Sequence, residues 1–262
     1  MRKAIYLVFV TLFIVTITSC TSDNVDVVQL KLLKKVIEIN VDGTSSTYNF
    51  TYNGTKIVSI NSELNTKTFT YTNNLITKII ELDNATQLQT TYTYSYIDDK
   101  LTQIICSDNY ELNYTYNADG TISYKKTTTD TNNNIVLIYH GALSFQNENI
   151  HNDKKTFDNT AVNILSKEEV SFVYDAKKNP FNNITGYNKL LNRFNTNSIN
   201  NATSSIEIAS TSYLDTNQIT SSAIQLPRVF QYDNGDYPIE IVSDKAVFEN
   251  QNKRHLKSLY FY

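Results

Sequence analysis

The fold follows from one stretch of sequence, Tyr48-Asn-Phe50-Thr-Tyr52-Asn-Gly54-Thr-Lys56-Ile57-Val58-Ser59-Ile60. Aromatic and polar residues alternate up to a short turn at Asn53-Gly54, and apolar and polar residues alternate after it. Successive side chains of a strand point to opposite faces, so Tyr48, Phe50 and Tyr52 share one face, and amides and hydroxyls share the other. Two alternating runs on either side of such a turn are typical of a β-hairpin.

The same pattern recurs along the chain. Three further copies occupy residues 69–79, 92–104 and 112–124, and two looser copies occupy 172–181 and 230–239. The last aromatic residues of the first four copies are Tyr52, Tyr71, Tyr96 and Tyr116. An isolated hairpin is only marginally stable, so the copies must pair side by side. The sequence therefore predicts an all-β fold, an antiparallel meander of repeated hairpins that forms a strongly curved sheet or a closed β-barrel.

One segment departs from this alternation. Residues 187–194 place Leu190, Leu191 and Phe194 on one side of a helix, which predicts one short helix there. The rest of the chain is rich in tyrosine and poor in glycine and proline, a composition that favours strands. We expect a single repeat-built β domain over residues 30–262, which is long enough to bury a sizeable core.

The N-terminal region is typical of an exported protein. Arg2 and Lys3 precede an apolar run over residues 4–17, which is too short to cross a bilayer core as a helix. The run ends in Ile17-Thr18-Ser19-Cys20, which resembles the bacterial lipobox. That resemblance implies cleavage before Cys20 and acylation of its thiol, which anchors the chain to a membrane. We therefore expect a signal peptide at 1–19 and a lipidated tether at 20–29. An uncleaved membrane anchor is the alternative.

The residues after Cys20 bear on where the domain faces. Residues 21–26 read Thr-Ser-Asp-Asn-Val-Asp and resemble the short Ser/Asp-rich export signal of surface lipoproteins in Bacteroidetes. The resemblance implies a lipid-anchored protein of the outer membrane, with exposure on the cell surface slightly favoured over a domain that faces the periplasm.

The repeats carry a second resemblance. The unit aromatic-x-Tyr-Asn/Asp-x-x-Gly/Lys-x-Ile is similar to the tyrosine–aspartate repeats of bacterial surface proteins. The closer resemblance is to Bacteroidetes lipoproteins in which such repeats precede a segment like Tyr174-Asp175…Asn179-Pro180-Phe181. It covers about 47–124, 170–194 and 225–242, although Asn or Thr stands where those repeats often have Asp-Gly. It implies a porin-like fold, described for domains of unknown function, and it supplies no activity.

Charge and cysteine content exclude several classes of protein. The net charge is −3, and it becomes −5 once Arg2 and Lys3 are removed. The sequence shows no strong basic patch, so we expect no nucleic-acid partner. If Cys20 carries lipid, Cys106 has no intramolecular disulfide partner. Its position directly after two isoleucines predicts a packed thiol.

Motifs for catalysis or metal binding are weak. His140, His151 and His255 lack the spacing of a metal site, and Phe145 stands where a serine nucleophile elbow needs its second glycine. Residues 130–134 begin like a calcium loop but lack its glycine and its bidentate glutamate, so they predict a polar turn. Residues 233–236 predict a hairpin turn first, with a calcium site as the alternative. We expect no enzyme, no metal site and no cofactor.

The aromatic faces leave two interpretations open. In the first, the rings pack as core inside a curved sheet. In the second, they form an exposed platform for a sugar ring or for an apolar patch of a partner. The candidate binding residues of the third and fourth copies are Tyr92, Tyr94, Tyr96, Tyr114 and Tyr116. The terminal run 256–262 resembles the last strand of outer-membrane barrels, but the apolar rows are short and rich in tyrosine for strands that cross a membrane.

These observations predict a cell-envelope lipoprotein that is a non-enzymatic binding module for a glycan, a peptide or another envelope protein. The alternative is a structural or assembly factor of the envelope, and a hydrolase with an unrecognised site is a third class. A cleft that gathers His140 or His151 with carboxylates would favour the enzyme. An exposed row of tyrosines would favour the binding module, and a completely filled interior would favour the structural role.

Overall fold

The computed structural model describes residues 30–159, 163–191, 198–244 and 255–262. Residues Lys31–Tyr262 form one compact unit. The predicted signal peptide and Cys20 lie outside the described residues, so the lipoprotein resemblance stays a prediction. Among the described residues, no helix is long and apolar enough to cross a membrane.

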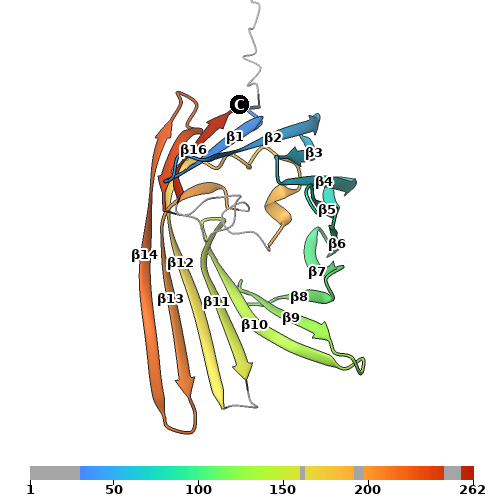
Figure 1. Ribbon diagram of the computed structural model, residues 1–262, viewed down its shortest axis with the longest axis vertical. Coiled ribbons are helices and arrows are strands. Elements are labelled where there is room, and N and C mark those ends of the chain that lie inside the picture. Colours follow the sequence, from blue (N-terminus) through green and yellow to red (C-terminus); the bar gives the residue numbers. More distant parts are fainter. Residues whose placement is uncertain (1–29, 160–162, 192–197, 245–254) are drawn as a thin grey trace, which may run out of the picture. The chain divides into compact units, whose positions relative to one another are not determined.

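The described residues form sixteen strands and one 3-10 turn (Figure 1). The strands are β1 Lys35–Asn40, β2 Ser45–Asn53, β3 Lys56–Asn61, β4 Asn65–Thr72, β5 Leu75–Asp83, β6 Gln89–Ile97, β7 Lys100–Cys106, β8 Tyr110–Tyr116, β9 Ile122–Thr129, β10 Ile135–Gln146, β11 Asn149–Asn159, β12 Ile164–Lys178, β13 Asn200–Tyr213, β14 Gln218–Tyr232, β15 Pro238–Ser243 and β16 His255–Phe261. Each strand pairs antiparallel with the next, and β16 pairs with β1 to close the barrel. The predicted antiparallel meander is confirmed, and of its two forms the structure has the closed one.

The hairpins of the repeats share a local design. In β2–β3, β4–β5 and β6–β7 the pairing register shifts just before the last tyrosine of the copy. The hydroxyls of these tyrosines then reach the backbone of a neighbouring element. Tyr71 accepts a hydrogen bond from the backbone N–H of Ile57, and Tyr96 donates to the carbonyl oxygen of Ile76. Ile57 and Ile76 each lie near the start of the second strand of a hairpin, and the tyrosine that bonds to each belongs to the next copy along the chain. These bonds therefore connect one copy to the next.

The alternation places apolar side chains inside and polar ones outside. On β2, Tyr48 and Phe50 are buried, whereas Thr47, Asn49 and Thr51 are exposed. The inward residues of most strands join a single apolar cluster in the interior of the barrel. The outward rows of β2, β4 and β6 consist mainly of Thr, Asn and Ser.

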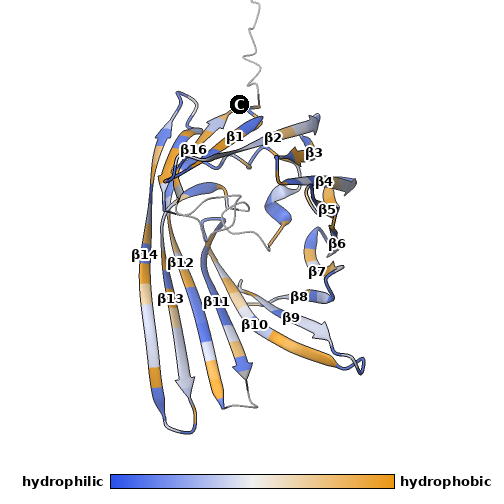
Figure 2. Ribbon diagram, in the orientation of Figure 1, coloured by the Kyte–Doolittle hydropathy of each residue, from blue (hydrophilic) through white to orange (hydrophobic). Residues whose placement is uncertain are grey.

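Strands β10 to β14 are longer than the rest and continue past the ends of their neighbours. Figure 2 shows hydrophobic stretches along β10, β12 and β14.

The segment 179–191, here called the interior segment, fills part of the barrel. Its residues Phe181, Ile184, Tyr187 and Leu190 belong to the apolar cluster. The rings of Phe181 and Tyr187 stack with centroids 5.3 Å apart. Tyr71 of β4 donates to the carbonyl oxygen of Thr185 at 3.0 Å, which fastens the segment to the β1–β5 side.

The helix predicted over 187–194 is a 3-10 turn of three residues, Tyr187–Lys189. Backbone bonds span three residues along this segment, from Ile184 to Phe181, from Tyr187 to Ile184 and from Leu190 to Tyr187. Side chains three apart eclipse one another in a 3-10 turn, which explains why the buried residues recur at that spacing. Leu190 is already extended, so the helical turn ends at Lys189. Residues 192–194 lie outside the described part.

Candidate functional site

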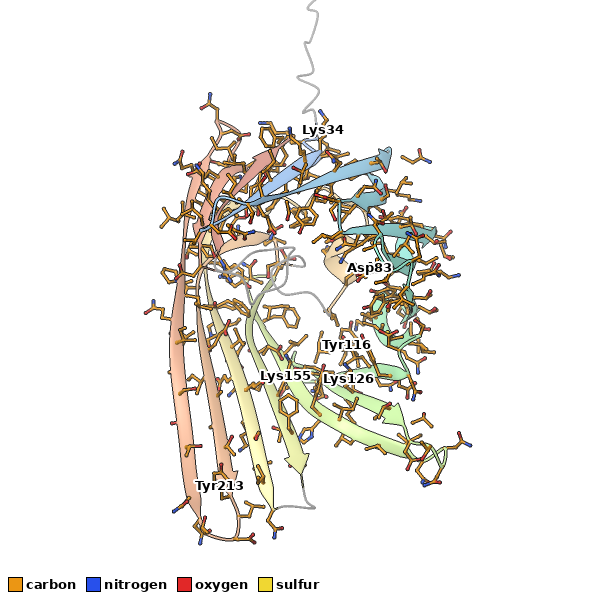
Figure 3. All side chains as sticks on the ribbon, in the orientation of Figure 1. Lys34, Asp83, Tyr116, Lys126, Lys155 and Tyr213 are labelled. Carbon is orange, nitrogen blue, oxygen red and sulfur yellow. The ribbon has the colours of Figure 1, made fainter. Side chains whose placement is uncertain are left out.

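The interior segment leaves a cavity on the inner face of β6 and β8 to β11. Its volume is about 240 Å³. Five tyrosines from four strands line it, namely Tyr92, Tyr110, Tyr114, Tyr124 and Tyr139. Three charged side chains, Lys126, Asp153 and Lys155, share the same walls, and Figure 3 shows the two lysines near one another. A polar cavity with aromatic walls inside an apolar interior is the arrangement expected of a small-molecule site.

Strand pairing explains why these residues meet. Lys126 of β9 lies opposite Leu112 of β8 on one side and Tyr139 of β10 on the other. Asp153 of β11 lies opposite Leu143 of β10. Because Ile122, Tyr124 and Lys126 are two residues apart, they point to the same face, and the first two are core residues. Lys126 therefore stands at an inward position that the pattern would otherwise give to an apolar side chain.

The ammonium group of Lys126 lies among aromatic rings. Its Nζ is 3.6 Å from the ring centroid of Tyr110 and 5.8 Å from that of Tyr139. Burial lowers the pKa of Lys126, Cys106 opposes that shift, and the nearby charge of Lys155 lowers the pKa further. Among the described residues, no carboxylate lies within ion-pair distance of Lys126. Its charge is therefore held by ring faces instead of a counterion.

Asp153 is the buried acid of the cavity. Its side chain accepts a hydrogen bond from the hydroxyl of Tyr124, and its Oδ2 lies 3.8 Å from Nζ of Lys155. Burial raises the pKa of Asp153, whereas the Tyr124 bond and the Lys155 charge lower it. Only a glycine fits beneath Tyr124, since a Cβ on Gly141 would lie 2.5 Å from the ring. The glycine that interrupts β10 thus makes room for the tyrosine that holds the acid.

The candidate aromatic residues all point into the barrel. Tyr92 and Tyr114 line the cavity, and the structure brings them together with the charged groups. Tyr94 is buried in the core. Tyr96 and Tyr116 pack against that core, and the backbone of Leu101 hydrogen-bonds to the hydroxyl of Tyr116. No row of these five tyrosines is exposed on the outside.

Several cavity residues were not predicted from the sequence, namely Tyr110, Tyr124, Lys126, Tyr139, Asp153 and Lys155. Lys126 did carry a signal, because it is a charged residue at an inward position of an alternating strand. Tyr139 follows a register shift in β10, after Leu137, which obscures which face it occupies. β11 belongs to no repeat copy, so its facing could not be read from the pattern.

Other candidate groups lie elsewhere. His140 lies 3.7 Å from Asp158, and both side chains are about 40% exposed. His151 is also exposed, so neither histidine enters the cavity. The described part of the chain holds no cluster of three metal-ligating side chains. Cys106 is buried, which confirms the packed thiol.

The predicted turns are polar turns in the structure. Asp130 accepts hydrogen bonds from the backbone N–H groups of Asn132 and Asn134. Asp233 does the same for Gly235 and Tyr237 in the β14–β15 hairpin. The carboxylates that resembled calcium ligands are therefore engaged by the backbone of their own turns.

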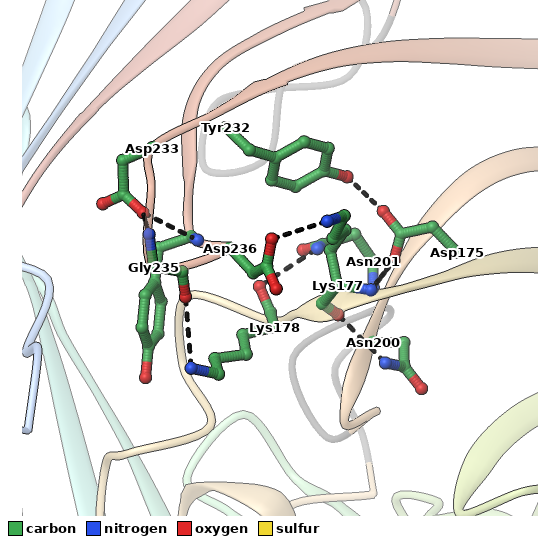
Figure 4. A network of polar contacts seen from close by, with 10 residues as sticks. Asp175, Lys177, Lys178, Asn200, Asn201, Tyr232, Asp233, Gly235 and Asp236 are labelled. Carbon is green, nitrogen blue, oxygen red and sulfur yellow. Dashed lines mark hydrogen bonds and ion pairs between the residues drawn. The ribbon is translucent and has the colours of Figure 1, made fainter. Parts of the chain in front are cut away.

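A second polar cluster connects neighbouring strands through hydrogen bonds and an ion pair and does not line the cavity. At the end of β12, Asp175 accepts hydrogen bonds from the hydroxyl of Tyr232 and from the backbone N–H of Asn201 (Figure 4). Lys177 pairs with Asp236 of the β14–β15 turn at 2.5 Å. The carboxylates here are matched by donors from neighbouring strands, so the cluster fastens β12, β13 and β14 together.

Comparisons with known proteins concern the fold. No protein-family model matches the chain, and no curated protein matches it. Among solved structures, the chain is similar to a porin-like protein from Bacteroides uniformis. The TM-score is 0.49 and the sequence identity 11%, over 87% of this chain and 96% of that chain. At this level of similarity, the chemistry of the cavity has to be understood from the residues of this chain.

Proposed function

We propose that the protein is a cell-envelope lipoprotein whose barrel binds a small molecule in its interior cavity without transforming it. The observation that carries the proposal is the cavity itself, which opens beside the apolar cluster of the interior. Its wall contains two lysines and a buried carboxylate. Charges at inward positions oppose folding unless they are paired, so a barrel with a purely structural role has no need of the partly buried Lys126 at such a position.

The proposed location is the outer membrane, where lipid on Cys20 holds the domain. The lipobox-like residues before Cys20 support this location, and the run after it slightly favours the cell surface over the periplasm. The outer rows of β2, β4 and β6 support a tethered domain, because Thr, Asn and Ser are the reverse of a lipid-facing apolar band.

A role as a structural or assembly factor of the envelope is the second candidate. The long strands favour it, because large apolar side chains are exposed there, including Ile135, which is 76% exposed, and Ile219, which is 72% exposed. Exposed apolar groups of this size often mark contacts with another protein. A partner on these strands would bind outside the cavity, so the two functions are separable by mutation.

The test of the proposed function is to ask what the purified protein carries. The protein is isolated from the cell that makes it and denatured, and released small molecules are quantified by mass spectrometry. We expect a molecule at near one equivalent from the wild type and its loss from Leu143→Trp, which fills the cavity. Ile105→Trp, on the exposed face of β7, is the matched control and should retain it. Equal amounts from all three proteins, or none from any, would contradict the proposal.

A further inference from the structure

We propose that the cavity takes an organic anion, in which a flat ring contacts the tyrosines and an acidic group lies against Lys126 and Lys155. This inference deepens the proposed function and rests on it, since it names the class of ligand that the same cavity would bind. It is carried by the unequal pairing of charges in the wall, by the rings beside them and by the size of the space.

The charged side chains of the cavity wall differ in whether they have a partner of opposite charge. Asp153 already has two partners, the hydroxyl of Tyr124 and the ammonium group of Lys155 at 3.8 Å. Glu168 lies opposite Lys155 in the pairing of β11 with β12, but it is exposed. Lys126 has no carboxylate within 4 Å among the described residues, and Lys155 stands near enough to repel it. An anion placed between the two ammonium groups would relieve that repulsion and supply the missing counterion.

The remaining wall suits a ring. Tyr110 and Tyr139 flank Lys126, and Tyr114 lines the same cavity. Burial raises the pKa of all three phenols, so they remain protonated and can donate hydrogen bonds to an acidic group. Tyrosine rings also offer flat apolar faces to a ring in the ligand.

Size limits the ligand to one or two rings. An apolar cavity of about 150 Å³ accommodates benzene. The cavity here has about 240 Å³. A single ring with an acidic side chain, or a small fused ring, therefore fits, whereas an oligosaccharide or a peptide does not.

A cationic ligand is the opposite possibility, because tyrosine faces can also form cages for cations. In this cavity the face of Tyr110 is already occupied by the ammonium group of Lys126. A second cation would meet two lysines at short range. The structure therefore favours an anion over a cation, and a neutral ring should bind with intermediate strength.

The absence of tryptophan from the chain allows a direct test with indole probes. Indole-3-acetate, indole-3-acetamide and tryptamine share one ring and differ in charge, and their fluorescence can be excited without tryptophan emission from the protein. Binding to the chain that carries Cys20→Ser, which prevents lipid attachment, is measured by fluorescence anisotropy. We expect the acid to bind at least tenfold more tightly than the amide, and tryptamine to bind most weakly.

Two lysine variants then locate the acidic group. Lys126→Met should bring the affinity for the acid down to that for the amide, while the affinity for the amide changes less than about twofold. Lys126→Arg should restore much of the preference for the acid. Lys125→Met is the matched control, because Lys125 is the exposed neighbour on the same strand, and it should leave the preference unchanged. Thermal unfolding of each variant checks that the barrel is intact.

Each outcome decides one of the two proposals. If the amide or tryptamine binds as tightly as the acid, and Leu143→Trp abolishes that binding in equilibrium dialysis, the cavity binds ligands but the inference of an anion is wrong. If none of the three probes binds at millimolar concentration, the inference is also wrong, and the release experiment above decides the proposed function separately. An acid preference that survives Lys126→Met places the anion elsewhere and overturns the inference.

Discussion

Substituting Gly141 by alanine is expected to destabilise the barrel, because Tyr124 occupies the space that a side chain needs. A Cβ on Gly141 would lie 2.5 Å from the Cζ and from the hydroxyl oxygen of Tyr124, and closer still to the carbonyl oxygen of Lys154. The ring must therefore move. Its hydroxyl would then no longer donate to Asp153, whose side chain is buried.

The size of the effect follows from three contributions. Overpacking a well-packed interior costs about 1–3 kcal/mol. Leaving a buried carboxylate without its donor costs about 1–3 kcal/mol more. Alanine offsets part of this, because it removes the roughly 0.5–1 kcal/mol penalty of a glycine within a strand. We expect a net loss of about 3 kcal/mol in the free energy of unfolding, or about 6–12 °C in Tm for a domain of this size.

Urea denaturation measures the loss, with Tyr124→Phe and Ser144→Ala as companions. Tyr124→Phe removes the hydroxyl without a clash, so it should lose less stability than Gly141→Ala. Both single variants lose the Tyr124–Asp153 hydrogen bond, and the double variant loses the same bond only one time. The summed stability losses of the single variants should therefore exceed the loss of the double variant by about 1 kcal/mol. Ser144 lies on the outer row of β10, so Ser144→Ala should change stability by less than about 0.5 kcal/mol. A Gly141→Ala protein as stable as the wild type would show that Tyr124 does not hold Asp153 in this way.

Four further predictions concern other parts of the molecule. Burial raises the pKa of Asp153, so the stability linked to its proton is present below the unfolded value near 3.8 and is lost as the pH rises through the folded pKa. Asp153→Asn should therefore gain stability relative to the wild type as the pH rises above about 4 in urea titrations, and a flat or falling difference would contradict this. Phe181→Ala should lower the free energy of unfolding by about 3–5 kcal/mol. Val173→Ala, at an exposed position, is the control and should change it by less than about 0.5 kcal/mol. Similar losses in the two variants would show that the interior segment does not support the barrel. Lys126→Met should change the free energy of unfolding by less than about 1 kcal/mol, because it exchanges a cation–π contact for relief from desolvation, and a much larger loss would assign this lysine a structural role. Cys20→Ala should move the protein from the membrane fraction to the soluble fraction, and protease treatment of intact cells, with a periplasmic control, then reports which way the anchored wild type faces.

The strand pattern was predictable because the alternation within each hairpin indicates which side chains face the interior. Tyr48 and Phe50 alternate with Thr and Asn, and the structure buries the first set and exposes the second. Closure was not predictable, since it depends on the pairing of β1 with β16, which lie at opposite ends of the sequence. The short helix predicted near 187–194 is a single 3-10 turn, Tyr187–Lys189, for a related reason. Its apolar spacing reflects burial inside the barrel and not an amphipathic surface.

The cavity was only partly predictable from the sequence. Tyr92 and Tyr114 belong to regular copies, so their inward facing followed from alternation. Asp153 and Lys155 come from β11, which lies outside the repeats, and nothing local indicates that they face Tyr124 across a glycine. A site assembled from neighbouring strands becomes visible only when their register is known.

The two sides of the barrel satisfy their tyrosines in different ways, and this difference explains where the cavity lies. On the β1–β5 side, hydroxyls such as those of Tyr52 and Tyr71 bond to backbone groups, and the interior segment fills the remaining space. On the β8–β11 side, Tyr124 bonds to a side chain, Asp153, and packs edge-on against Tyr139 with ring centroids 6.2 Å apart. Space lined by hydroxyl, ammonium and carboxylate groups is polar enough to hold water or a ligand, unlike an apolar void. Leucine or phenylalanine at these positions would close the interior at less cost in desolvation. The retention of charged groups where apolar ones would pack is therefore the strongest physical reason to regard this side of the barrel as a binding site.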